Sequence, residues 1–263
     1  MMSNLQNRIL LVEGDDDKHF VKNFVENFCR RRLSEKLACK FADEDEENNS
    51  NNDNDNSRSV LYIDSRSRKK GGIKNMIDDI PLKIKEAGRE AVGILADANG
   101  YSLDSCKHPW QKIKTKLEEV LTLEEHLPER PCQEGLIRRN ITPKQKPKST
   151  LCIGVWLMPD NQSKGELENF FARLIHENNP TWARANEYIN QCIESMEQAD
   201  NQRGGFDTGK PYKVSKSKVY AWLATRKKPG KMAAAISEGH GLDFDSELAQ
   251  RFARWLEKLF CDF

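Results

Sequence analysis

Short apolar runs alternate with amphipathic stretches along the first two thirds of the chain. Four runs are rich in branched aliphatic residues and have the length of buried strands: Arg8–Val12, Val60–Ile63, Ala91–Ala96 and Leu151–Met158. In the stretches that follow, apolar residues recur every three or four positions, which predicts helices over residues 20–28, Ile73–Ala87, Trp110–Leu121 and Glu166–Ile175. Because strands alternate with helices, we expect βαβ crossovers and an α/β fold with a mainly parallel sheet flanked by helices.

The chain becomes mainly helical after the fourth strand. Helical spacing covers Thr181–Met196, Ser215–Thr225 and Ser246–Phe260. We therefore expect residues 177–263 to form additional C-terminal helices that pack on or beside the sheet. Residues 1–263 as a whole are interpreted as a single domain.

Two polar segments do not fit a packed core. Residues 43–58 are acidic and Asn-rich and include no apolar side chain. They cannot bury enough surface to offset the entropy of ordering, so we predict a disordered insertion there. Arg138–Thr150 is basic and contains two prolines, and we predict a solvated connection, with a nucleic-acid contact as the alternative.

The overall charge excludes a histone-like, polybasic protein. Lys and Arg number 42 against 41 Asp and Glu, a formal net charge of +1. Any binding of a polyanion must then come from a local patch. Six basic residues around one predicted helix and its end form such a patch: Lys216, Lys218, Arg226, Lys227, Lys228 and Lys231. A solvated helix face is an equally good interpretation of these residues.

Neither the apolar runs nor the cysteines indicate a membrane or secreted protein. The longest apolar runs, Ile9–Val12 and Cys152–Pro159, are far shorter than the ~20 residues of a membrane span. Acidic residues from Glu13 to Asp17 stand where a signal peptide would be apolar. The seven cysteines include no Cys-x-x-Cys pair, so we expect free thiols in a reducing cytoplasm.

Acidic residues follow three of the predicted strands. Glu13, Asp97 and Asp160 each stand at the carboxyl end of a strand, where open parallel sheets bind ligands. Asp17 lies one helical turn after Glu13 and presents its carboxylate on the same side. Crowded carboxylates repel one another, and a hard divalent cation such as Mg²⁺ or Mn²⁺ relieves that repulsion. The alternative for any single acid is a helix cap or a solvated strand end.

Several sequence blocks resemble a known domain. LLVEGDDDKHF at Leu10–Phe20 and LADAN at Leu95–Asn99 are similar to the TOPRIM domain of topoisomerases, primases and OLD-family nucleases. Further blocks, in the same order, resemble an uncharacterised bacterial family of TOPRIM-like proteins with a domain of unknown function: GVWLMPDN at Gly154–Asn161, GELENFF at Gly165–Phe171, VYAWLATRKKPGK at Val219–Lys231 and RFARWLEKLF at Arg251–Phe260. The resemblance spans nearly the whole chain and implies a TOPRIM-like fold.

The resemblance also implies roles for particular acids. Glu13 matches the acid that acts on the scissile phosphate or binds a metal ion, and Asp97 matches the first residue of an Asp-x-Asp motif. Asp17 matches a second acid that OLD-type nucleases place four residues after the first. Asn99 stands where the second Asp of the motif is usual, and its amide oxygen can coordinate a metal without supplying charge. Metal affinity should fall, or another acid must substitute.

Glu168, in the helix after the fourth predicted strand, is the main candidate for that substitution. Asp160 and Glu166 are weaker candidates. The expected metal ligands are therefore Glu13, Asp17, Asp97, Asn99 and Glu168, with Glu13 and Asp97 as the catalytic residues.

The activity that the resemblance implies is an Mg²⁺- or Mn²⁺-dependent nuclease acting on DNA or RNA. Such relatives often work with an ABC-type ATPase in phage defence, and this chain has no phosphate-binding P-loop of its own. The alternative hypothesis is a non-catalytic module that binds nucleic acid, a nucleotide or a partner protein. A nucleotidyl transferase such as a primase is a third hypothesis, but no triphosphate site is evident.

Overall fold

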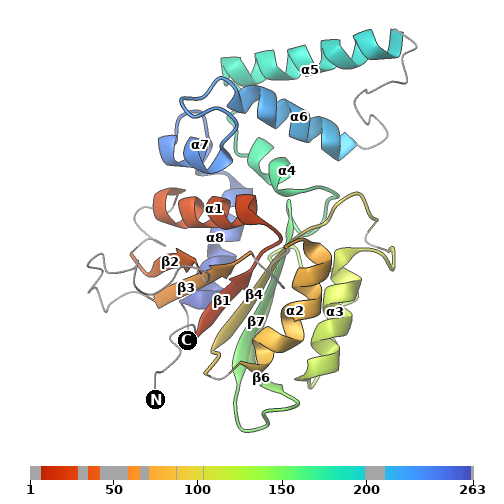
Figure 1. Cartoon of the computed structure of the whole chain (residues 1–263), viewed down its shortest axis with the longest axis vertical. Helices are drawn as coiled ribbons and strands as arrows, with labels where there is room; N and C mark the ends of the chain where they lie inside the picture. The colour runs from red at the N-terminus through yellow and green to blue at the C-terminus, as the bar shows by residue number, and fades with distance from the viewer. Residues whose placement is uncertain are drawn as a thin grey trace.

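The described part of the chain folds as seven strands enclosed between helices (Figure 1). The computed structural model describes residues 7–28, 35–41, 59–65, 71–86, 88–102, 104–198 and 211–261. The predicted insertion at residues 43–58 lies outside the described residues. The predicted α/β fold with a mainly parallel sheet flanked by helices is confirmed.

The strands lie in the order β2-β3-β1-β4-β7-β6-β5. Their bounds are β1 Arg8–Leu11, β2 Leu37–Phe41, β3 Ser59–Asp64, β4 Ala91–Asp97, β5 Leu121–Thr122, β6 Leu136–Pro143 and β7 Leu151–Met158. The neighbouring strands β2, β3, β1, β4 and β7 are all parallel. By contrast, β6 pairs antiparallel with β7, and β5 pairs antiparallel with β6. The four predicted strands correspond to β1, β3, β4 and β7.

The remaining three strands lie at the two edges of the sheet. In β2, buried Leu37, Cys39 and Phe41 alternate with half-buried residues, as expected for an edge strand. The prediction of a solvated connection over Arg138–Thr150 is wrong for its first half, because residues up to Pro143 belong to β6. The pattern of β6 is obscured by its exposed polar residues and by an irregularity between Arg138 and Ile141, where Asn140 has φ 54°.

Helices cover both faces of the sheet. The helical segments are α1 Asp15–Asn23 with a π-helical extension at Phe24–Phe28, α2 Ile73–Lys85, α3 Pro109–Val120, α4 Leu167–Ala172, α5 Pro180–Gln198, α6 Pro211–Leu223, α7 Met232–Glu238 and α8 Glu247–Phe260. Helices α2 and α3 lie on one face, and α1, α7 and α8 on the other (Figure 1). Helices α4, α5 and α6 extend beyond the carboxyl edge of the parallel strands. Among the described residues, no helix combines the length and the apolar character that crossing a bilayer requires.

Each face of the sheet has its own apolar core. The α2–α3 face buries residues such as Ile9, Ile94 and Trp110. The other core continues from β1 through α4, α6 and α7 to α8. Gly93 and Gly154 are register partners on β4 and β7, and a Cβ atom at Gly93 would lie 2.8 Å from the ring of Phe260. The two glycines thus let α8 approach the centre of the sheet closely.

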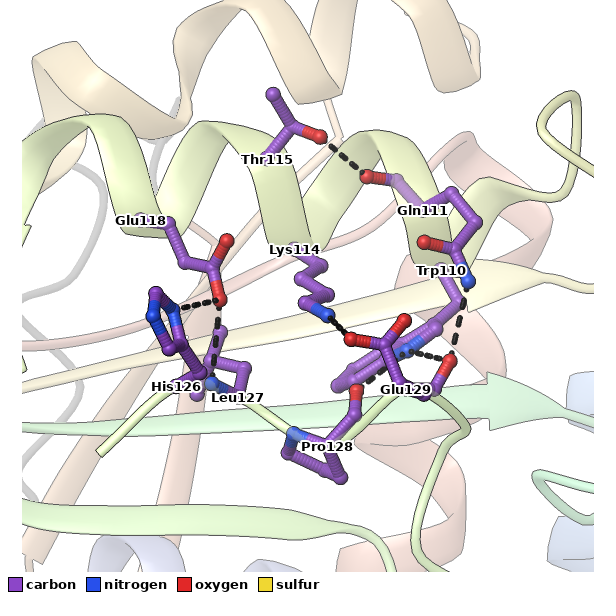
Figure 2. A network of polar contacts seen from close by, with 9 residues as sticks. All are labelled: Trp110, Gln111, Lys114, Thr115, Glu118, His126, Leu127, Pro128 and Glu129. Atoms are coloured by element: carbon purple, nitrogen blue, oxygen red, sulfur yellow. Dashed lines mark hydrogen bonds and ion pairs between the residues drawn. The ribbon is translucent and has the colours of Figure 1, made fainter.

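A polar network fastens α3 to the loop that follows β5 (Figure 2). Trp110 Nε1 donates to the backbone oxygen atoms of Pro128 and Glu129, and Lys114 pairs with the Glu129 carboxylate at 2.5 Å. Glu118 accepts from the Leu127 N–H group on the same side of the helix. The polar groups of this network are hydrogen-bonded or ion-paired with one another. We therefore interpret the network as a structural contact.

Candidate acidic site at the carboxyl edge of the sheet

Glu13 and Asp97 lie close together at the topological switch point of the sheet. There, β2 and β3 lie on one side of β1, and β4 and β7 lie on the other. β1 and β4 are parallel neighbours, although β2 and β3 come between them in the sequence. Glu13 lies two residues beyond β1, and Asp97 is the last residue of β4. The carboxyl edge at such a switch point is the place where open α/β sheets bind ligands. The predicted convergence of these two acids is therefore present.

Backbone N–H groups fix one oxygen of each of three carboxylates. Asp97 N donates to Glu13 Oε1 at 2.7 Å, and Leu167 N, at the start of α4, donates to Asp97 Oδ1 at 2.9 Å. Gly14 N donates to Asp17 Oδ2 at 3.0 Å. The structure gives the second oxygen of each carboxylate no hydrogen-bond donor among the residues that it describes. Three oriented carboxylates thus each retain an oxygen atom for a ligand.

Asp17 has a local structural role as well. It is the third residue of α1, and its side chain reaches back to the N–H group of Gly14, the residue before the helix. Asp15 accepts from Ser65 Oγ at 2.7 Å, and Asp16 is exposed in the same first turn. The three acids favour the helix start because the amino end of a helix attracts negative charge.

Burial and mutual repulsion disfavour negative charge on these carboxylates. Burial, with added repulsion from Asp17 and Glu166, raises the pKa of Glu13 from its ordinary 4.5 to about 8. Burial and the charge of Glu168 raise the pKa of Asp17 from 3.8 to about 7. The pKa of Asp97 is raised well above its usual range, first by burial and then by the charges of its acidic neighbours. Such displaced pKa values are typical of functional sites.

These pKa values predict the pH dependence of stability. The folded protein holds protons on Glu13 and Asp17 that the unfolded chain releases above pH ~4. The free energy of unfolding in EDTA should therefore fall as the pH rises from 5 to 8 and level off above that range. We expect a loss of several kcal/mol, since each pH unit of displacement corresponds to about 1.4 kcal/mol. Urea unfolding at several pH values measures it, and stability that rises over this range would contradict the charge distribution described here.

Two lysines of α6 neutralise the acids of the neighbouring helix. Lys216 Nζ lies 2.6 Å from Glu168 Oε1 and 3.6 Å from Glu166 Oε2, and Lys213 Nζ lies 2.6 Å from Glu166 Oε1. Burial alone would lower the pKa of Lys216, but the two carboxylates raise it above its usual range. Within the described residues, no lysine or arginine forms an ion pair with Glu13, Asp17 or Asp97. The sequence pattern did not single out Lys213; its three-residue spacing to Lys216 on a helix was the available signal.

Asn99 has a conformation and a hydrogen bond that suit an amide. Its φ is 56°, in the left-handed region that Asn tolerates better than most residues. Its backbone exchanges two hydrogen bonds with Gly165, and its Nδ2 donates to the backbone oxygen of Asp97 at 3.1 Å. An ionised Asp could not donate that bond. Asn99 thus joins the end of β4 to the approach to α4, beside the acids.

Asp160 is occupied in its own loop. It pairs with Arg173 and accepts from the N–H groups of Gln162 and Ser163 and from Ser163 Oγ. Burial opposes ionisation, but the hydrogen bonds from Arg173 and Ser163 lower the pKa of Asp160. Its negative charge is therefore compensated locally.

The donor set fits a hard divalent cation in its chemistry. Carboxylate oxygens are the ligands that Mg²⁺ and Mn²⁺ prefer, and a positive ion would lower the raised pKa values of Glu13, Asp17 and Asp97. As the side chains stand, no group of three or more described His, Cys, Asp or Glu residues is arranged to hold a metal ion. Cation binding would therefore require rotation of the free carboxylate oxygens toward one point.

One family model matches almost the whole chain. Its description is "Protein of unknown function (DUF3226)", and the match covers residues 7–261. No curated protein and no solved structure matches the chain.

Proposed function

The chain belongs to the DUF3226 family, and on that premise we propose from its acidic site that it is a TOPRIM-like, metal-dependent nuclease that cleaves phosphodiester bonds of DNA or RNA. The observation that carries the proposal is the set of three partly free carboxylates, Glu13, Asp17 and Asp97, at the switch point of the sheet. Their raised pKa values supply a physical reason for a cation to bind there.

Glu13 is proposed to transfer protons. Without a cation its pKa is about 8, and a bound cation would lower that pKa toward neutral pH, where a carboxyl group both accepts and donates protons efficiently. The hydrogen bond from Asp97 N holds its Oε1 atom in place, so its Oε2 atom is the one free to contact substrate or water.

Asp17 and Asp97, together with the amide oxygen of Asn99, are the proposed metal ligands. A bound Mg²⁺ or Mn²⁺ would polarise the phosphate and help to ionise a water molecule. Glu168 is a weaker candidate, because Lys216 already neutralises it through Oε1 at 2.6 Å. If Glu168 turned toward the metal ion, Lys216 would become available to a phosphate oxygen.

The proposed cellular setting rests on the sequence. The similarity to TOPRIM nucleases supports an ABC-type ATPase partner and a role in phage defence. The six described cysteines are free thiols, which supports a reducing cytoplasm.

The experiment is incubation of the purified protein with plasmid DNA, single-stranded DNA and tRNA in Mn²⁺ or Mg²⁺. The proposal predicts cleavage of at least one substrate, and EDTA should abolish it. Activity that persists in EDTA would contradict the metal-dependent mechanism.

A non-catalytic binding module is the second candidate. Asn99 in place of an acid, and the Lys216–Glu168 ion pair, both reduce the negative charge available to a metal ion. Binding of nucleic acid without cleavage of any of the three substrates in Mn²⁺ would favour this candidate.

A further inference from the structure

A groove of about 880 Å³ lies along α1, the helix whose first turn contains Asp17. It runs between α1 on one side and α7 with the segment that precedes α7 on the other, and α1 and α7 pack side by side (Figure 1). Asp16, His19 and Asn23 line it from α1. Asp16 belongs to the same first turn of α1 as Asp17, so this helix links the groove to the acidic site, although Asp17 itself does not line the groove.

The structure divides the six basic residues that the sequence singled out as a patch. Lys216 pairs with Glu168, and Lys218 does not line the groove. The three lysines that line it, Lys227, Lys228 and Lys231, are exposed. Within the described residues, none of these three forms an ion pair with an acid. Asp16 and Glu238 also line the groove, without pairing with these lysines.

The turn that bears the lysines is anchored on the fold. Arg226 stacks over the ring of buried Trp222 at 4.2 Å, and its Nη2 atom donates to Thr181 Oγ1 at 2.9 Å. Thr225 Oγ1 donates to the backbone oxygen of Trp222 at 2.7 Å. The lysines therefore project from a fixed turn, which reduces the entropy lost when a ligand binds.

We propose that this groove binds the phosphodiester backbone of a nucleic-acid strand on one side of the scissile phosphate. The proposal rests on the proposed function, because the strand would lead from the groove to Glu13 and Asp97. Three lysines without acidic partners provide the positive charge that successive phosphates require. Without a cation, the carboxylates of the acidic site repel a phosphate. The lysine groove is therefore the electrostatically favourable place for the strand to bind first.

The test is fluorescence anisotropy with labelled oligothymidylate or oligouridylate, in EDTA so that cleavage plays no part. The variant replaces Lys227, Lys228 and Lys231 with Gln. A matched control replaces Lys74, Lys107 and Lys112, which are exposed in and beside α2 and α3 on the other face of the sheet. Both variants lose three positive charges.

We expect the groove variant to bind about 10-fold or more weakly at low salt and the slope of log K against log salt to become shallower by about 2, since each lost phosphate contact contributes about 0.7 on single strands. The control should bind as the wild type does. Equal weakening in both variants, or an unchanged groove variant, would overturn the inference. Metal-dependent cleavage distinguishes the two proposals: without it the nuclease assignment fails, whereas lysine-dependent binding in EDTA can still hold.

Discussion

Replacing Glu13 with Gln is expected to lower Mn²⁺-dependent cleavage about 10²–10⁴-fold, the contribution typical of a general acid or base. Gln retains an oxygen that accepts from Asp97 N, so the backbone contact survives. The variant loses the carboxylate that exchanges protons and, with it, one negative charge of the proposed metal site. Initial rates on the most readily cleaved of the three nucleic acids measure the effect.

The same variant should be more stable than the wild type in EDTA at pH 8. Near that pH, folding forces Glu13 either to keep a proton or to hold a buried charge, because its folded pKa is about 8 and its ordinary value 4.5. Gln removes this penalty. We expect the free energy of unfolding to rise by about 1–3 kcal/mol, because Asp17 and Asp97 influence the ionisation of Glu13. The gain should vanish below pH ~4, where the carboxyl group is protonated in both states.

Glu124→Gln is the matched control, because Glu124 is an exposed acid in the loop after β5. It should change neither the cleavage rate nor the pH dependence of stability. Undiminished cleavage by the Glu13→Gln variant would remove Glu13 from the mechanism. Reduced activity accompanied by reduced stability would instead indicate a structural role for this side chain.

Replacing Lys216 with Met is expected to destabilise the protein by about 3 kcal/mol. The side chains of Glu166 and Glu168 are nearly buried, at 7% and 6% exposure, and Lys216 contacts both. Removal of one partner leaves a buried carboxylate without compensation, which costs about 3–5 kcal/mol. The lower value applies because the Lys216 side chain is 40% exposed. Urea unfolding in EDTA gives the free energy.

Addition of Mn²⁺ should restore part of this stability if Glu168 is then free to act as a metal ligand. Lys218→Met is the control on the same helix, since Lys218 forms no ion pair among the described residues. It should change the free energy of unfolding by less than about 0.5 kcal/mol. A Lys216→Met variant as stable as the wild type would mean that the ion pair at 2.6 Å contributes nothing to folding.

The parts of the fold with a strong hydrophobic pattern were predictable. β4 and β7 are buried almost throughout and have uninterrupted apolar sequences, and the parallel order follows from their alternation with helices. β6 was missed because a strand with exposed Arg139 and Asn140 and an irregular register resembles a loop in sequence. An antiparallel strand with one solvated face buries fewer side chains than a central parallel strand, so its apolar signal is weaker.

The candidate site was predictable only in part. Strand ends located Glu13 and Asp97 correctly, because parallel strands bring their carboxyl ends to one edge. The contacts of Lys213 and Lys216 with the α4 acids depend on how α6 packs, and no local pattern encodes that packing. The hydrogen bond from Asn99 to the backbone of Asp97 likewise becomes evident only in three dimensions.

The central claim is that Asp17 and Asp97 hold a divalent cation beside Glu13 at this edge of the sheet. Calorimetric titration of Mn²⁺ at pH 8 into the wild type and into an Asp97→Asn variant tests it most directly. Asn retains an oxygen that can accept from Leu167 N but lacks the charge. We predict saturable binding at millimolar Mn²⁺ or below in the wild type, and affinity weaker by about 10-fold or more in the variant. Absence of binding at millimolar Mn²⁺, or equal affinity in the two proteins, would contradict the account.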